Sequence, residues 1–198
     1  MRSLDRRLGH ALACAALATS ACAYAQQPAN CSIGPIPDRA LEFSIGAEKV
    51  PPPPLTRIRK ISEMTTGGQT FDQYDVSVQD KDIFANTEVS FSVLVPKGQQ
   101  PDGWTFRKLP TRETAKQPGP QEGLPEVQSW SVKDKSRKLD ASHVGFIASL
   151  RVEFGKRSGN VLPGRVYLCV PGGQTSRMFG DKLPDPITLV GRFEAQVR

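Results

Sequence analysis

The sequence is poor in the residues that carry most enzymatic catalysis and metal binding. It contains two histidines and four cysteines in 198 residues. Beyond residue 25 the sequence has one histidine, His143, and two cysteines, Cys31 and Cys169. Imidazole is the usual base near neutral pH, and a structural zinc site needs four thiolate or imidazole ligands. We therefore expect no catalytic residues of the serine–histidine type, no metal and no cofactor. The sequence also lacks a Gly-Xaa-Ser-Xaa-Gly elbow.

Long apolar runs are missing as well, and the longest one lies at the start of the chain. Residues 8–18 are apolar and follow the basic residues Arg2, Arg6 and Arg7. This run is about half the roughly 20 residues that a membrane-spanning helix needs, which favours a cleaved signal peptide over an anchor. We predict residues 1–25 as the signal peptide, cut after Ala23-Tyr24-Ala25. The product is then periplasmic or secreted, from a bacterium.

A lipoprotein is the alternative for this segment. Cys14 or Cys22 would then carry the lipid, but neither has a good apolar residue three positions before it.

The charge pattern argues against a nucleic-acid partner. The net charge is +6, yet basic and acidic residues interleave and no aromatic residues are threaded among them, so no nucleic-acid platform is expected.

Cys31 and Cys169 remain as a pair in an oxidising compartment, and we predict a disulfide between them. The bond would close a loop of well over 100 residues, for which the chain-entropy model gives about 4.7 kcal/mol of stabilisation. A disulfide brings two Cα atoms to roughly 5.5 Å. The N-terminal segment is therefore expected to lie beside the penultimate strand.

Apolar residues alternate with polar ones along most of the remaining chain, as in half-buried antiparallel strands. The clearest runs are 144–154 and 187–197, in which Arg151 and Arg192 face outward. Six shorter runs bring the number of readable strands to eight; they contain Leu41-Phe43-Ile45, Tyr74-Val76-Val78, Val89-Phe91-Val93-Val95, Trp104-Phe106, Gln128-Trp130-Val132 and Val166-Leu168-Val170.

Helical periodicity is absent except for one turn at 37–40. We predict residues 26–198 as a single all-β domain, an antiparallel two-sheet sandwich that is immunoglobulin-like in architecture. The separation of Cys31 and Cys169 is too large for the usual inter-sheet bridge of immunoglobulin domains. A closed β-barrel is the alternative fold.

Two irregular stretches interrupt this pattern. The prolines of 50–55 predict a polyproline II segment that serves as a linker, a crossover or a sheet edge. The stretch 109–125 contains four prolines and mixed charges, and it predicts a long exposed loop.

Two sets of residues are candidates for binding. Trp104 and Trp130 would form a sugar-stacking or protein-binding surface if exposed, although their polar neighbours favour burial in the core. The only dense acidic cluster, Asp80, Asp82, Asn86 and Glu88, resembles a calcium loop in the spacing of its oxygen ligands. That match fails at Phe84 and lacks the glycine of the sharp turn, which favours a solvated turn.

No catalytic constellation is readable, so our leading hypothesis is a non-enzymatic interaction module whose partner is an envelope or extracellular protein. A carboxylate-dependent hydrolase is the first alternative, and it requires two acids that converge in a cleft. A glycan-binding domain is the second, and it requires an exposed Trp104 or Trp130.

Overall fold

The chain folds into β-strands throughout the part that the structure describes. The computed structural model describes residues 31, 35–80, 86–108, 127–176, 178 and 180–198, and these contain thirteen strands and no helix. The strands are β1 Glu42–Ile45, β2 Glu48–Val50, β3 Leu55–Thr66, β4 Gln69–Gln79, β5 Thr87–Pro96, β6 Thr105–Lys108, β7 Val127–Asp134, β8 Leu139–Ser142, β9 Ser149–Phe154, β10 Val161–Val170, β11 Gln174–Thr175, β12 Lys182–Leu183 and β13 Ile187–Val197. The all-β prediction is confirmed. The predicted signal peptide and the predicted loop 109–125 lie outside the described residues.

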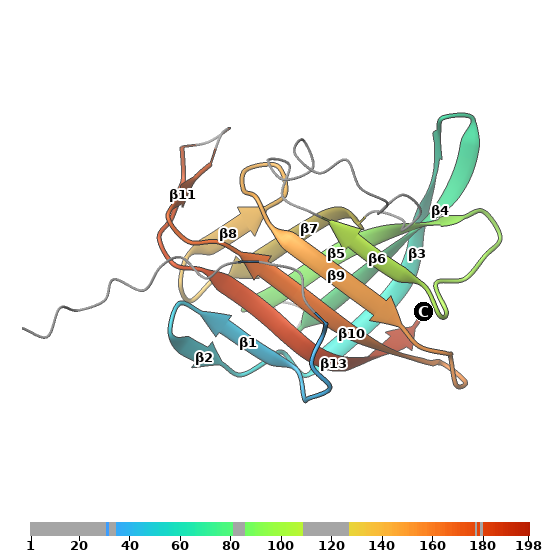
Figure 1. Cartoon of the computed structure of the whole chain (residues 1–198), viewed down its shortest axis with the longest axis horizontal. Helices are drawn as coiled ribbons and strands as arrows, with labels where there is room; N and C mark the ends of the chain where they lie inside the picture. The colour runs from blue at the N-terminus through green and yellow to red at the C-terminus, as the bar shows by residue number, and fades with distance from the viewer. Residues whose placement is uncertain (1–30, 32–34, 81–85, 109–126, 177, 179) are drawn as a thin grey trace, which may run out of the picture.

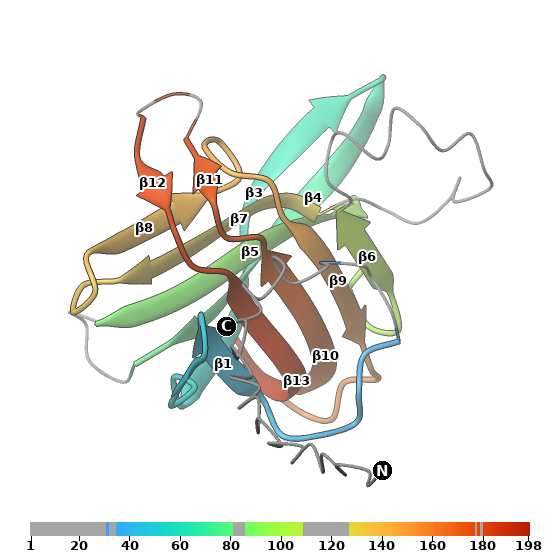
Figure 2. The same ribbon diagram turned by 60° about the vertical axis from the view of Figure 1, so that its left-hand side comes forward.

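Eleven strands form one continuous sheet that folds over on itself. Its front half contains β6, β9, β10 and β13, with β1 and β2 attached to β13, and its back half contains β3, β4, β5, β7 and β8. The front half lies in front of the back half in Figure 1, and Figure 2 shows the same two layers from the side. The halves are joined by a short parallel pairing of β13 with β3, in which Gln196 faces Arg57 and Val197 faces Ile58.

This sheet differs from the prediction of two separate sheets, and it also excludes the alternative of a closed barrel. The path of paired strands ends at β6 on one side and at β8 on the other. In the described ranges, β6 pairs with β9 alone and β8 pairs with β7 alone. The sheet therefore keeps open edges.

The core lies between the two halves. Alternate residues point inward in most of the long strands, as in β4, where Tyr74, Val76 and Val78 are buried. The largest fully buried side chains come from both halves and include Phe43, Phe106, Phe91 and Trp130. One cluster of buried apolar side chains connects them, so the two layers are held together by apolar burial as well as by the short β13–β3 pairing.

Several predicted elements differ from the observed ones. The run 144–154 is not one strand, because β8 ends at Ser142, a turn follows, and β9 begins at Ser149. Val144, predicted to face the core, is 45% exposed in that turn. The predicted helical turn at 37–40 is a bend, and the sequence pattern does not predict β3.

The prolines of 50–55 form a crossover, one of the three roles that the sequence leaves open. Residues 51–54 connect β2, which among the described strands pairs with β1 at the front half, to β3 in the back half. Proline cannot donate to a strand ladder, so the segment separates two paired strands without extending either one.

The disulfide joins the N-terminal segment to the outer face of the front half. Cys31 is bonded to Cys169 of β10, with 5.4 Å between their Cα atoms, and the Ser149 hydroxyl of β9 donates to the Cys31 carbonyl. Further along this segment Ile36 is 5% exposed, and the Arg192 N–H donates to the Arg39 carbonyl. The described residues of the segment are thus tied to β10 at Cys31 and to β13 at Arg39, and the contact with β10 is the one that the cysteine pairing predicts.

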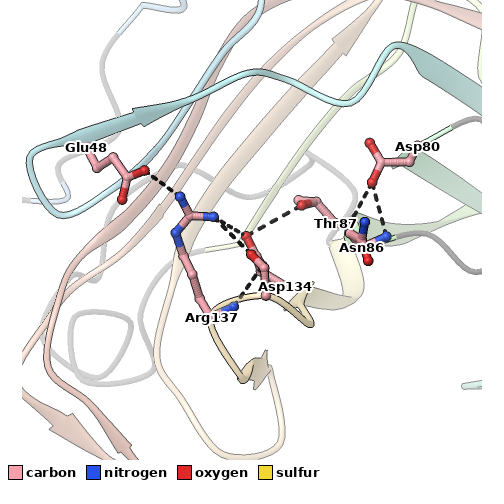
Figure 3. A network of polar contacts seen from close by, with 7 residues as sticks. Glu48, Asp80, Asn86, Thr87, Asp134 and Arg137 are labelled. Carbon is pink, nitrogen blue, oxygen red and sulfur yellow. Dashed lines mark hydrogen bonds and ion pairs between the residues drawn. The ribbon is translucent and has the colours of Figure 1, made fainter.

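A buried carboxylate connects hairpins of the two halves (Figure 3). Asp134, at the end of β7, is fully buried. Its carboxylate accepts hydrogen bonds from the Ser136 hydroxyl at 2.6 Å, from the Arg137 N–H at 3.1 Å and from the Arg137 guanidinium at 2.8 Å. The Thr87 hydroxyl lies 3.5 Å away. Arg137 also pairs with Glu48 of β2, so one arginine connects the β7–β8 turn to the β1–β2 hairpin.

A glycine allows two aromatic rings to meet across β10. Gly164 lies between Phe154 and Phe193 in register, and their ring centroids are 6.0 Å apart. A Cβ atom at Gly164 would lie 2.4 Å from the Phe193 ring. We expect Gly164→Ala to lower the free energy of unfolding by about 2 kcal/mol, because the ring must leave its rotamer or the strands must shift.

Urea denaturation of a double-mutant cycle with Phe193→Leu checks this. The smaller side chain removes the ring that the new methyl group meets, so the two changes should be coupled by about 1 kcal/mol or more. Purely additive effects would show that the ring contact is not the cause.

Candidate functional site

The outer face of the front half carries four arginines in two facing pairs. Strand register places Arg107 of β6 opposite Arg151 of β9, and Arg165 of β10 opposite Arg192 of β13. Phe106, Val152, Val166 and Phe193, their neighbours along the strands, are buried in the core. Because successive side chains alternate, all four arginines point to the outer face. We call Arg107, Arg151, Arg165 and Arg192 the arginine face.

Like charges in direct cross-strand pairs destabilise a sheet. One carboxylate compensates part of the repulsion here. Glu153 pairs with Arg151 at 2.7 Å and with Arg165, its register neighbour, at 2.6 Å, and its side chain is only 17% exposed. Asp38 lies 3.4 Å from Arg192. Glu153 and Asp38 therefore neutralise the arginines of this face only in part.

The guanidinium groups differ in what they still offer to a ligand. The Arg151 Nε is buried and has no hydrogen-bond partner among the described residues. The side chains of Arg165 and Arg192 are 44% and 60% exposed. A guanidinium has five N–H donors in a planar fork, so one carboxylate does not use all of them. Donors thus remain for an anion from solution.

A groove of about 700 Å³ lies on this face, in the size range of binding sites for small ligands. Its walls include Thr105 of β6, Glu153 of β9, Arg165 of β10, and Arg192 and Glu194 of β13. Bidentate hydrogen bonding to carboxylate, phosphate or sulfate is the recognition that arginine geometry suits best. The groove can therefore bind an anionic group between Arg165 and Arg192.

Two carboxylates, Glu153 and Glu194, line the same groove, which bears on the hydrolase alternative. They belong to strands on either side of β10, so two strand spacings of about 4.8 Å separate their backbones. Glu153 is held between two guanidinium groups. Such a carboxylate fixes arginine positions, and the pair does not have the environment of a general acid facing a general base.

The structure separates the two predicted binding tryptophans. Trp130 is 2% exposed and lies in the core, as its polar neighbours favour, so its side chain does not offer a binding surface. The position is inward because Val127, Trp130 and Val132 fill the inner face of β7. Trp104 is partly buried, packs against the core and stacks on Phe106 with 5.9 Å between ring centroids. The two tryptophans do not form one surface.

The described residues of the predicted acidic cluster contact the protein backbone or face a neighbouring strand. The Asp80 carboxylate accepts hydrogen bonds from the Asn86 and Thr87 N–H groups, each at 3.1 Å (Figure 3). Glu88 faces Lys133 across β5 and β7. Asp82 lies outside the described residues. Where side chains are described, no group of three His, Cys, Asp or Glu residues is placed to hold a metal ion.

The one histidine beyond the predicted signal peptide lies in the turn after β8. His143 is exposed, and its backbone N–H donates to the Trp130 carbonyl at 3.1 Å. The ring Nδ1 lies 3.4 Å from the same carbonyl oxygen. The residue lies outside the walls of the groove. His143 therefore contacts the backbone of β7, as a turn residue does, and is not part of the candidate site.

No model of a protein family, no curated protein sequence and no solved structure matches this chain. Within the ranges that the structure describes, no helix is long and apolar enough to cross a membrane.

Proposed function

We propose that this protein is an exported, non-enzymatic binding module that holds an acidic segment of an envelope or extracellular protein in the groove of the arginine face. The observation that carries this proposal is the placement of Arg165 directly opposite Arg192 in the wall of the groove. A cross-strand pair of like charges costs folding free energy, and an anion between the two guanidinium groups offsets that cost.

The fold supports a binding role of this kind. In this proposal the folded sheet is a two-layer sandwich that is immunoglobulin-like in its general architecture. Its paired strands hold the arginines at fixed spacing. The Cys31–Cys169 disulfide is compatible with an extracytoplasmic location, which is where a signal peptide would send the chain.

Binding of a glutamate-rich decapeptide by residues 26–198 tests the proposal. We expect measurable binding by isothermal titration calorimetry, weakening as salt rises, because the attraction is between exposed charges. The double variant Arg165→Ala and Arg192→Ala should bind at least about tenfold more weakly, which corresponds to the loss of about 1.4 kcal/mol.

The matched control replaces two exposed lysines that line neither pocket, Lys49 of β2 and Lys133 of β7. Lys49→Ala with Lys133→Ala removes the same net charge. Equal weakening by both double variants would mean that only the overall charge matters, and the groove would lose its role. If neither double variant changed the affinity for the peptide, the proposal of an anionic partner would be refuted.

A further inference from the structure

A second, smaller pocket lies where the two halves of the sheet are joined. It has a volume of about 210 Å³ and is formed where the end of β13 lies beside β3. Its polar walls include Lys60, Tyr74, Gln100, Arg157 and Arg198. We call this the seam pocket. It is smaller than the roughly 300–1,000 Å³ typical of sites for organic ligands, so its occupant must be small.

Arg157 is held in this wall in a fixed orientation. Its N–H donates to Asp102 at 3.0 Å, and its guanidinium donates to Gln100 at 3.0 Å and to Asp102 at 3.3 Å. The Arg157 Nε is nevertheless buried and has no partner among the described residues. A buried N–H donor without an acceptor destabilises the fold. A ligand that accepts a hydrogen bond from the Arg157 Nε would remove this cost.

Lys60 is held on another side of the pocket. Its ammonium group lies 2.7 Å from Asp72 and 3.1 Å from Glu63, and Asp72 also accepts the Gly98 N–H at 3.1 Å. These carboxylates fix the position of the ammonium group, and an ammonium has three donors. The hydrogen bond from Lys60 lowers the pKa of Asp72, which keeps that carboxylate ionised and Lys60 in place.

The remaining walls also suit an anion. Its described lining residues include four basic ones, Arg59, Lys60, Arg157 and Arg198, and no Asp or Glu. Tyr74 is 5% exposed, and burial raises the pKa of its phenol, so the ring stays neutral at physiological pH and does not repel a negative ligand.

We propose that the seam pocket binds one small tetrahedral oxyanion, phosphate or sulfate, either free or as the end of a monoester. The anion accepts hydrogen bonds from Arg157 and Lys60 and so connects β3 to the loop that carries Arg157. This proposal is independent of the arginine face, because the two sites share none of their described lining residues.

The test is the melting temperature of residues 26–198 in sodium phosphate or sodium sulfate, compared with sodium chloride at equal ionic strength. Both oxyanions stabilise proteins generally, so the comparison between variants is the decisive readout. We expect saturating phosphate to raise the Tm of the wild type by about 3 °C more than it raises the Tm of Lys60→Met. Titration calorimetry should show one site, weakened about tenfold in that variant.

Two further variants separate binding from folding. Arg157→Lys keeps the positive charge and removes the Nε donor, so it should lose phosphate affinity while its circular dichroism spectrum stays that of the wild type. Lys49→Met is the matched control, because Lys49 is 80% exposed on β2, where it pairs with Glu42. It should respond to phosphate like the wild type.

Glycerol 2-phosphate distinguishes the source of the oxyanion. Binding of this ester as tight as that of inorganic phosphate identifies the end of a monoester as a ligand, and binding of the inorganic ion alone identifies free phosphate. The proposal is overturned if all the variants respond equally to phosphate and chloride, or if Lys60→Met and Lys49→Met lose the same affinity.

Discussion

Removal of the Cys31–Cys169 disulfide should lower the free energy of unfolding by about 4 kcal/mol, the largest single effect that we expect. The two cysteines are 138 residues apart, and the chain-entropy model gives about 4.7 kcal/mol for a closed loop of 100 residues. Urea denaturation of the oxidised protein and of the double variant Cys31→Ala and Cys169→Ala measures the difference. An unchanged midpoint and slope would show that the bond adds nothing to stability.

The variant without the disulfide should also show faster hydrogen exchange where the N-terminal segment contacts β13 than in the rest of the front half. The Arg192 N–H donates to the Arg39 carbonyl at 2.8 Å, a contact of the segment that the disulfide holds. Hydrogen exchange at Arg192 should therefore become faster relative to an amide deep in the front half, such as that of Leu168. If both amides accelerated equally, the disulfide would act on the whole fold and not on the N-terminal segment.

Asp134→Ala should be the second most destabilising change, at about 3 kcal/mol. The substitution removes a fully buried carboxylate and takes away the acceptor of the Ser136 hydroxyl and of the Arg137 Nη1 group. Arg137, which joins the β7–β8 turn to the β1–β2 hairpin through Glu48, then loses the contact that fixes its position. Asp140→Ala is the control, because Asp140 is exposed on the neighbouring strand β8 and should change stability by less than about 0.5 kcal/mol.

The stability difference between the wild type and Asp134→Ala should also depend on pH, in a direction that the pKa of Asp134 determines. Burial raises the pKa of its carboxyl group, but hydrogen bonds from Ser136 and Arg137 outweigh burial and hold the pKa below the ordinary value. Its stabilisation is then present above the unfolded pKa of about 3.9 and is lost as the pH falls through the folded value. The stability difference between wild type and Asp134→Ala should be constant near neutral pH and should shrink below about pH 4. A difference that grew on acidification would contradict this account.

The sequence predicts the buried strands well because burial on one face leaves a period of two. Phe43, Val76, Phe91, Leu168 and Phe193 all lie in the core as their alternation indicates. β3 lacks this alternation because most of the strand is not buried on one face. Only its first part packs on the core, and from Ile61 onward it forms an arm with β4 whose side chains are mostly exposed. Figure 1 shows this arm extending beyond the rest of the sheet.

The arginine face is only partly visible in the sequence. The alternation places Arg151 and Arg192 outward, but outward arginines are ordinary in half-buried strands. What makes them a candidate site is register, which sets Arg165 directly opposite Arg192 and Arg107 opposite Arg151. Register depends on which strands neighbour each other over long sequence separations, and a single sequence does not contain that information. Burial of the tryptophans is visible in the sequence, since their polar neighbours favour it, and Trp130 lies in the core while Trp104 packs against it.

Photocrosslinking in cells tests the binding role of the arginine face most directly. A photoreactive residue in place of Glu194, which lines the groove, should give one discrete crosslinked partner protein, and this product should disappear when Arg165→Ala is added. The same residue in place of Gln128, exposed on β7 in the back half, should not give that product. Identical products from both positions, or a product at Glu194 that survives Arg165→Ala, would contradict binding through the arginine face.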